Sequence, residues 1–257
     1  MSALEVQIRD GIAFLALNRP EKLNAINDEM LGGLYDAADR LNQTPELKGA
    51  VLLGRGRAFS AGGDIEAMEA MTDRTFADTI SLYMRVGAAF RACAKPIIAA
   101  VHGYALAGGF ELMLLADVRI AARGTKFGLP DTPLGLSPTS GMTYLLPRII
   151  GLGHALDLTL SGDIIDTEEA HRLGLVTRLS EPGALLADAE AYARKLASYP
   201  LVGITNTKRG FYDALDSDHG AATRHEEERE LACFRDKEVK GRFRQFLSRT
   251  RSGGAGS

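Results

Sequence analysis

The spacing of hydrophobic and polar residues changes several times along the chain, and each change predicts a new element. Residues 1–10 alternate apolar and polar side chains, which predicts a strand, and residues 11–18 pair with it as a hairpin. After a loop, Asn27 can cap a helix. The apolar face of that helix has helical spacing and comprises Met30, Leu31, Leu34, Ala38 and Leu41.

Strands and helices then alternate through the middle of the chain. The apolar run at residues 50–54 predicts a buried strand, and residues 64–92 have a helical pattern with a break near Thr72. Further strands are expected near Pro96 and Asp117. The repeated order of strand, strand and helix predicts an α/β fold.

The last part of the chain loses its strand pattern. Beyond about Pro182, residues 184–198 and 224–249 are charged, rich in Ala and Leu, and helical in spacing. We therefore expect a C-terminal helical region. The predicted organisation is a core over residues 1–190 that holds the functional site, a helical oligomerisation region over 191–251, and a flexible Gly- and Ser-rich tail over 252–257.

Composition narrows the function classes without choosing one. The chain has 257 residues, 46% of them hydrophobic, so it can bury a large core. Its net charge of −3 gives no overall basic footprint for nucleic acid. The basic stretch 237–251 is the one local candidate, and a solvated helix explains it better, so no nucleic acid partner is expected. Cys93 and Cys233 have no ligand spacing, which predicts reduced thiols and no metal site.

The N-terminus and the apolar runs predict a soluble, cytoplasmic protein. Residues 1–10 lack the basic and long apolar parts of a signal peptide. The longest apolar stretch, residues 96–122, is interrupted by His102, Glu111 and Asp117, which excludes a membrane-spanning helix there. His102 follows a predicted strand, where a structural histidine is the better interpretation than a catalytic base.

Two glycine-rich turns carry the candidate chemistry. One is residues 58–64 after a buried strand, and the other is residues 103–109, which precede a helix that is expected to begin at Phe110. Backbone N–H groups in such turns can stabilise an anionic oxygen. Turns of this kind are also common in α/β proteins that have no site there. Two acidic residues nearby, Glu111 and Asp131, favour the catalytic interpretation.

The motifs around these turns resemble those of a known protein family. Three of them stand in order along the chain: Ala58-Phe59-Ser60-Ala61-Gly62-Gly63-Asp64, Gly103-Tyr104-Ala105-Leu106-Ala107-Gly108-Gly109-Phe110-Glu111-Leu112 and Phe127-Gly128-Leu129-Pro130-Asp131. They resemble the signatures of the enoyl-CoA hydratase/isomerase (crotonase) superfamily. The resemblance covers nearly the whole chain and continues through residues 135–143, 146–151, 161–162 and 170–176. It implies a spiral of repeated ββα units.

The resemblance also implies a reaction and its residues. The amides of Gly63 and Gly108 would form an oxyanion hole, and Glu111 and Asp131 would do the acid and base work on an acyl-CoA thioester. The expected reaction is hydration of a 2-enoyl-CoA or dehydration of a 3-hydroxyacyl-CoA, and coenzyme A enters only as part of the substrate, so no cofactor is expected. The family's hydratases have glutamate where this chain has Asp131, which keeps an enoyl- or dienoyl-CoA isomerase as the alternative. A family member without turnover, or one that binds RNA, is a further alternative.

Binding residues follow from the same likeness. The loop holding Lys22, Leu23 and Ala25 and the segment holding Ala61, Asp64 and Ile65 would contact coenzyme A, although a lysine such as Lys22 is more often a plain surface residue. Met68 and Met71 would line the acyl pocket, whereas core packing is the usual role of such residues. The family's C-terminal helices imply a homotrimer or a hexamer made of two trimers.

The two candidate acids allow one electrostatic prediction. Carboxylates that lie close together repel each other, so the pKa of either Glu111 or Asp131 should rise and keep a proton available near neutral pH.

Overall fold

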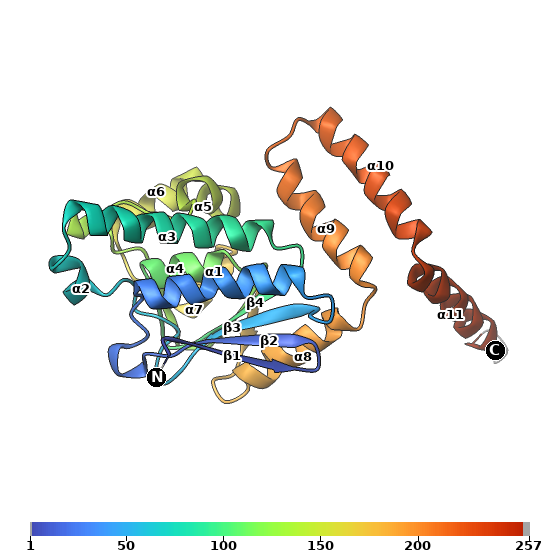
Figure 1. The fold of residues 1–257 in the computed structure, drawn as a ribbon, viewed down its shortest axis with the longest axis horizontal. Coiled ribbons are helices and arrows are strands. Elements are labelled where there is room, and N and C mark those ends of the chain that lie inside the picture. The colour runs from blue at the N-terminus through green and yellow to red at the C-terminus, as the bar shows by residue number, and fades with distance from the viewer. Residues whose placement is uncertain (1, 254–257) are drawn as a thin grey trace.

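A six-stranded sheet organises the fold of the computed structural model, which describes residues 2–253 (Figure 1). Its hydrogen-bonded order is β1 (Leu4–Arg9), β2 (Ile12–Leu17), β3 (Gly49–Gly54), β4 (Ile97–Val101), β6 (Val118–Ala122) and β8 (Arg178–Ser180). β1 and β2 form the predicted antiparallel hairpin, and every later strand joins in parallel. The mostly parallel sheet confirms the predicted α/β class.

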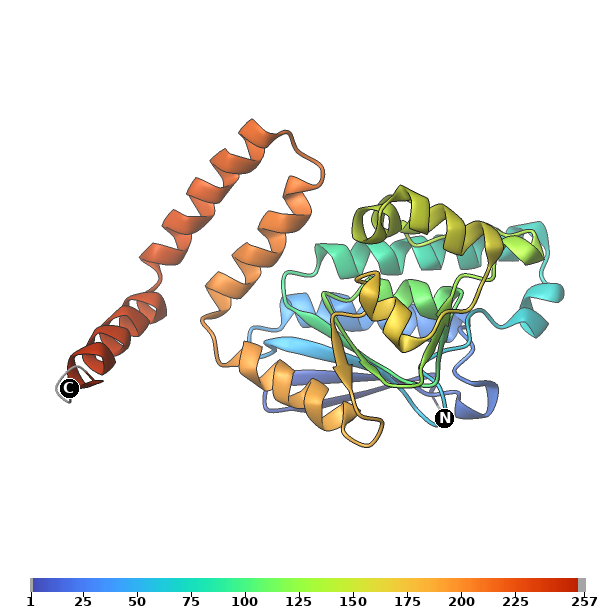
Figure 2. The same cartoon turned by 180° about the vertical axis from the view of Figure 1, so that it is seen from behind.

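Both faces of the sheet are covered by helices. Successive side chains of a strand point to opposite faces, and apolar side chains of these strands are buried on both. Within β2, Leu15 and Leu17 face the larger core, which includes α1 (Asp28–Gln43), α3 (Asp73–Ala92) and α4 (Gly108–Leu114). Phe14 faces the opposite way, against α8 (Leu185–Ala197). Figure 2 shows α8 on the other side of the sheet from those three helices.

The first two helical predictions are confirmed. The Asn27 side chain caps α1 by accepting from the Met30 amide, and all five predicted core residues of that helix are buried. The break expected near Thr72 separates α2 (Ile65–Glu69) from α3, and Thr72 begins α3 with a reciprocal capping box with Thr75.

The second glycine-rich turn differs from its prediction. Residues 104–106 of the expected turn form a strand, β5 (Tyr104–Leu106), and α4 begins at Gly108 rather than at Phe110. β5 pairs in parallel with β7 (Lys126–Gly128) in a small separate sheet. The partner strand comes later in the chain, so the local sequence around Gly103 does not reveal the pairing.

Further short helices lie in the connections between the strands. They are η1 (Pro20–Lys22), η2 (Thr132–Leu134), α5 (Met142–Ile150), α6 (Leu152–Ser161) and α7 (Thr167–Arg172).

The C-terminal helices extend away from the sheet (Figures 1 and 2). They are α9 (Leu201–Ala214), which the sequence pattern did not predict, α10 (His219–Arg235) and α11 (Lys237–Gly253). The single helix expected over residues 224–249 is two helices, because Asp236 leaves the helical conformation and its carboxylate accepts from the Glu238 amide. The boundary expected at residue 190 falls inside α8, and the projecting part begins with α9.

The predicted tail lies partly in a helix. Residues 252 and 253 belong to α11, and residues 254–257 lie outside the described part of the chain. Cys93 and Cys233 are free thiols. Among residues 2–253, no helix combines the length and apolar character that crossing a membrane requires.

A buried ion pair fastens α9 to the sheet. Lys208, whose side chain is only 7% exposed, lies 2.8 Å from Asp117, which follows α4 at the start of β6. Its ammonium also donates to the Lys95 carbonyl at 3.0 Å, and the Tyr212 hydroxyl donates to Asp117 at 3.3 Å. The first projecting helix is therefore held to the core by buried polar contacts.

Candidate active site

One backbone amide is unpaired in the loop that follows β3. The amides of Phe59, Ser60, Ala61, Gly62 and Asp64 all donate hydrogen bonds within the fold. The Gly63 amide has no protein acceptor among residues 2–253. The loop is fixed on both sides of this amide, so its donor is presented by a rigid frame.

A second amide without a protein acceptor in the described part of the chain begins α4. Gly108 is the first residue of the helix, where an amide has no intrahelical acceptor. Ala107 precedes it with φ 47° and ψ −124°, a strained conformation for a residue with a side chain. Gly62 packs directly on Ala107, since a Cβ added to Gly62 would lie 2.9 Å from that of Ala107. The two glycine-rich turns are thus in contact.

Gly63 and Gly108 converge on one hydroxyl group. A Cβ added at Gly63 would lie 3.6 Å from the Tyr83 oxygen, and one added at Gly108 would lie 2.9 Å from it. Tyr83 comes from α3 and is 4% exposed. The sequence pattern places Tyr83 in the core and gives no signal for this position between the two turns.

Glu111 is buried and held by three donors. It lies one turn into α4 and is 2% exposed. Its Oε1 accepts from the Thr139 amide at 2.6 Å, and its Oε2 accepts from the Thr139 hydroxyl at 2.6 Å and the Ser140 hydroxyl at 2.9 Å. Burial raises the pKa of Glu111, while the hydrogen bonds from Thr139 and Ser140 act in the opposite direction.

Asp131 differs from Glu111 in its hydrogen bonds. It precedes η2, and among the described residues its buried Oδ2 has no hydrogen-bond partner. Burial raises the pKa of Asp131 as well. The pKa prediction therefore needs correction, because both acids are shifted upward and burial is the main cause. The charge of Asp131 contributes to Glu111 only as the smallest effect.

The charges of both acids also act on Tyr83. Burial raises the pKa of Tyr83 well above its usual range, and the charges of Glu111 and Asp131 raise it further. The tyrosine therefore stays neutral. Gly63 and Gly108 therefore both border the Tyr83 hydroxyl group, and Glu111 lies one turn into the helix that Gly108 begins.

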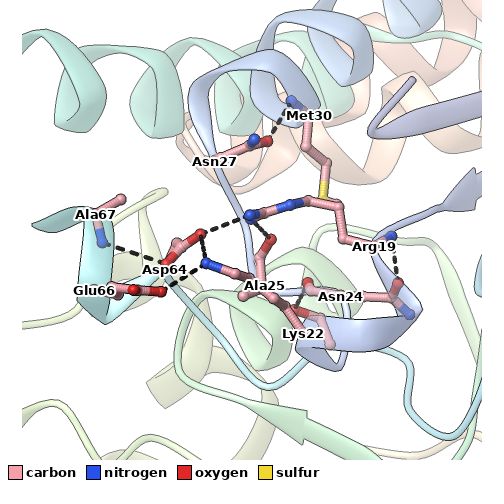
Figure 3. Close-up of polar contacts among 10 residues, drawn as sticks. Arg19, Lys22, Asn24, Ala25, Asn27, Met30, Asp64, Glu66 and Ala67 are labelled. Atoms are coloured by element: carbon pink, nitrogen blue, oxygen red, sulfur yellow. Dashed lines mark hydrogen bonds and ion pairs between the residues drawn. The ribbon is translucent and has the colours of Figure 1, made fainter. Parts of the chain in front are cut away.

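Hydrogen bonds and an ion pair connect the two segments that are expected to contact coenzyme A (Figure 3). The Ala61 amide donates to the Leu23 carbonyl at 3.0 Å. Arg19 donates to the Ala25 carbonyl and to Asp64, both at 2.7 Å. Arg19 lowers the pKa of Asp64, whose other oxygen caps α2 through the Ala67 amide. The Asp64 side chain is therefore committed to internal contacts.

Lys22 and Ile65 lie at the surface of these segments. Lys22 forms ion pairs with Glu66 at 2.8 Å and with Asp64 at 3.5 Å, so it is more constrained than a free surface lysine (Figure 3). Its pKa is raised, mainly by the hydrogen bond to Glu66. The Ile65 side chain is exposed.

Met68 and Met71 line a cavity of about 230 Å³ with Ile26, Asn27 and Thr79 among its other walls. Met68 also borders the first turn, since a Cβ added at Gly63 would lie 2.8 Å from its terminal methyl group. The Nε2 atom of His102 is 3.0 Å from the Gly56 carbonyl oxygen, in accord with the structural interpretation.

Comparison with known proteins identifies the family of the chain. The sequence profile described as enoyl-CoA hydratase/isomerase matches residues 7–251. The chain belongs to the enoyl-CoA hydratase/isomerase family. It is 33% identical over 244 residues to crotonyl-CoA hydratase of Syntrophomonas wolfei, covering 95% of this chain and 94% of the relative.

Other family members extend the likeness. Short-chain-enoyl-CoA hydratase of Clostridium acetobutylicum is 32% identical over 239 residues, which cover 93% of this chain and 92% of the relative. The crystal structure of enoyl-CoA hydratase from Bacillus anthracis superposes with a TM-score of 0.93 at 27% identity and covers 96% of each chain. The family and its crotonase fold, which the motifs suggested, are confirmed.

Proposed function

We propose that this protein adds water to the double bond of a 2-enoyl-CoA thioester, or removes it from a 3-hydroxyacyl-CoA. The observation that carries the proposal is that Gly63 and Gly108, whose amides have no protein acceptor among the described residues, both border the Tyr83 hydroxyl at the start of the helix that holds the buried Glu111. Relatives named crotonyl-CoA hydratase and short-chain-enoyl-CoA hydratase support hydration as the reaction.

The two amides would bind the thioester oxygen. Addition of water at C3 of the substrate places negative charge on that oxygen as an enolate forms. Fixed N–H donors stabilise this charge without having to reorganise, and a single donor of this kind contributes about 3 kcal/mol in comparable sites. The strained Ala107 and the bonded loop of residues 59–64 keep the two donors in place.

The two acids would complete the reaction. Glu111 accepts a proton from water as the water oxygen bonds to C3. Asp131, whose raised pKa favours the protonated form, delivers a proton to C2. The sum is one water added across the double bond. The side chains and amides described here are sufficient for this chemistry, so no cofactor is part of the proposal.

The remaining parts of the substrate would lie against the flanking segments. The backbone around Leu23, Ala25 and Ala61 and the cation of Lys22 would receive coenzyme A, with Lys22 facing its phosphates. Met68 and Met71 would border the acyl group. Both assignments rest on the family likeness and on the proximity of these segments to Gly63.

Assembly is also part of the proposal. The projecting helices expose large apolar side chains, including Phe211 at 75% and Phe234 at 54% exposure. Apolar side chains gathered on projecting helices indicate contact with other chains. We propose that these helices pack between copies of this chain in a trimer or a pair of trimers.

A panel of thioesters tests the reaction. The purified protein is incubated with 2-enoyl-, 3-enoyl- and dienoyl-CoA substrates while the absorbance of the conjugated double bond is followed. A hydratase consumes the absorbance of a 2-enoyl-CoA. If the absorbance instead appears from a 3-enoyl-CoA, and 2-enoyl-CoA is left unchanged, the protein is an isomerase and the proposal is wrong.

A further inference from the structure

The segment between η2 and α5 supplies both hydroxyl groups that bind Glu111. Thr139 and Ser140 place three donors on one carboxylate, at 2.6, 2.6 and 2.9 Å. A carboxylate has about four acceptor positions on its two oxygens. Three are occupied by the protein, so about one remains for a water molecule.

The backbone of this segment is built to bring the hydroxyl groups inward. Ser140 has φ 53°, in the left-handed region that residues with side chains seldom adopt. Gly87 of α3 allows the close approach, because a Cβ there would lie 2.8 Å from the Ser140 carbonyl oxygen. Strained backbone of this kind clusters at functional sites.

The environment of Glu111 contrasts with that of Asp131. Within residues 2–253, one buried oxygen of Asp131 has no donor, whereas each oxygen of Glu111 accepts at least one hydrogen bond. Donors aimed at a carboxylate favour its ionised form, and a buried oxygen without donors favours the protonated form. The two acids of the site are therefore made unlike by their surroundings.

We propose that Thr139 and Ser140 are positioning residues that keep Glu111 ionised and hold its one free acceptor position toward the attacking water. This inference rests on the proposed function, since it assigns to Glu111 the role of base in hydration. Neither hydroxyl group touches the substrate in this assignment, and both act through Glu111.

No other titratable group that interacts with Glu111 in the described part of the chain favours its ionised form. The titratable groups whose charges reach it are Asp131 and Tyr83. Tyr83 is neutral, and Asp131 contributes a like charge when it is ionised. Burial also disfavours the charged form, so the hydrogen bonds from Thr139 and Ser140 are what oppose the upward shift in the pKa of Glu111.

The test compares T139V, S140A and the double variant with wild type over a range of pH. Each variant removes a hydroxyl donor and keeps the Thr139 amide. The acid limb of kcat/KM for a 2-enoyl-CoA should move to higher pH by about one unit for each donor lost. T139S, which restores the hydroxyl group, should return the limb to its wild-type pH. Either single variant carries the test if the double variant does not fold.

A direct titration separates this inference from the proposed function. Carbon-13 NMR of protein labelled at the glutamate side-chain carboxyl carbons follows Glu111, whose signal is identified by its loss in E111Q. A Glu111 signal that titrates at higher pH in T139V and S140A supports the inference even if no enoyl-CoA is hydrated. An unchanged Glu111 titration in both folded variants overturns it, whatever the activity.

Discussion

Arg19 Nη2 lies 2.7 Å from Asp64 Oδ2 and joins two loops that are 45 residues apart in the chain (Figure 3). Asp64 directly follows Gly63, whose amide is one of the two unpaired donors. The same carboxylate caps α2 through the Ala67 amide. One ion pair thus fixes the position of a candidate oxyanion donor and the start of a helix together.

A double-mutant cycle on this pair should show strong coupling. Removing Arg19 in R19M leaves a buried carboxylate with weaker partners, and we expect the free energy of unfolding to fall by about 2 kcal/mol. D64N keeps a capping side chain and removes the charge. Urea unfolding of R19M, D64N and R19M/D64N measures the coupling, and additive effects would contradict it.

The same pair has a defined dependence on pH. Arg19 lowers the pKa of Asp64 below its unfolded value of 3.8, so its stabilisation is present above pH 3.8 and is lost as the pH falls through the lowered value. The difference in free energy of unfolding between R19M and wild type should therefore become smaller as the pH falls below 3.8.

Glu111→Gln should lower turnover by on the order of a hundredfold or more, because a general base contributes about that much. Binding of an acyl-CoA product should change far less. Steady-state rates and product binding measured on the same preparation check both statements. Near-normal turnover in E111Q would remove Glu111 from the mechanism.

Gly108→Pro tests the second amide, with Gly108→Ala as its control. Both variants add a Cβ beside the Tyr83 hydroxyl, and only proline removes the N–H. Proline suits the first position of a helix, so α4 can retain its start. Turnover of G108P should lie about 10²–10³-fold below that of G108A. Equal rates in the two folded variants would exclude the Gly108 amide from the oxyanion hole.

Lys22→Ala should raise KM for an enoyl-CoA by roughly fivefold, since an exposed charge pair contributes little more than that. The expected cause is the loss of a cation facing the coenzyme A phosphates. An enoyl-pantetheine thioester lacks the nucleotide and its phosphates, so its KM should stay the same in the variant. Equal effects on the two substrates would contradict a phosphate contact.

Asp131→Asn should raise thermal stability at neutral pH. Burial raises the pKa of Asp131 above its unfolded value of 3.8, so folding favours the protonated form. Wild-type stability consequently falls as the pH rises from 3.8 through the raised value, and asparagine avoids this loss. The gain in Tm should be larger at pH 7 than near pH 3.8. A gain that does not depend on pH would exclude this cause.

Local sequence predicted those parts of the fold that local contacts decide. The apolar spacing from Met30 to Leu41 located one helix and its buried face, and the capping Asn27 located its start. The two glycine-rich turns and the two nearby acids, Glu111 and Asp131, indicated the candidate chemistry, because turns and acidic residues of this kind are visible in the local sequence. The family motifs then singled out Gly63 and Gly108 as the proposed amide donors.

Contacts between distant segments were not predictable in this way. Thr139 and Ser140 reach Glu111 only because Gly87 lets their segment approach α3, and no local pattern reports that approach. Tyr83 resembles any aromatic residue on a buried helical face. α9 was missed since its single buried residue is a lysine, which finds its partner Asp117 on another element.

The order of strands in the sheet has a consequence for synthesis. The hydrogen-bonded order β1-β2-β3-β4-β6-β8 repeats the order in which the strands leave the ribosome. Each new strand therefore adds to an edge that already exists, which suits folding from the N-terminus during translation. All the proposed catalytic residues emerge before β8. Lys208 of α9, which forms the ion pair with Asp117, is synthesised after β8. A nascent chain can thus assemble its active site while one buried carboxylate still lacks its cation.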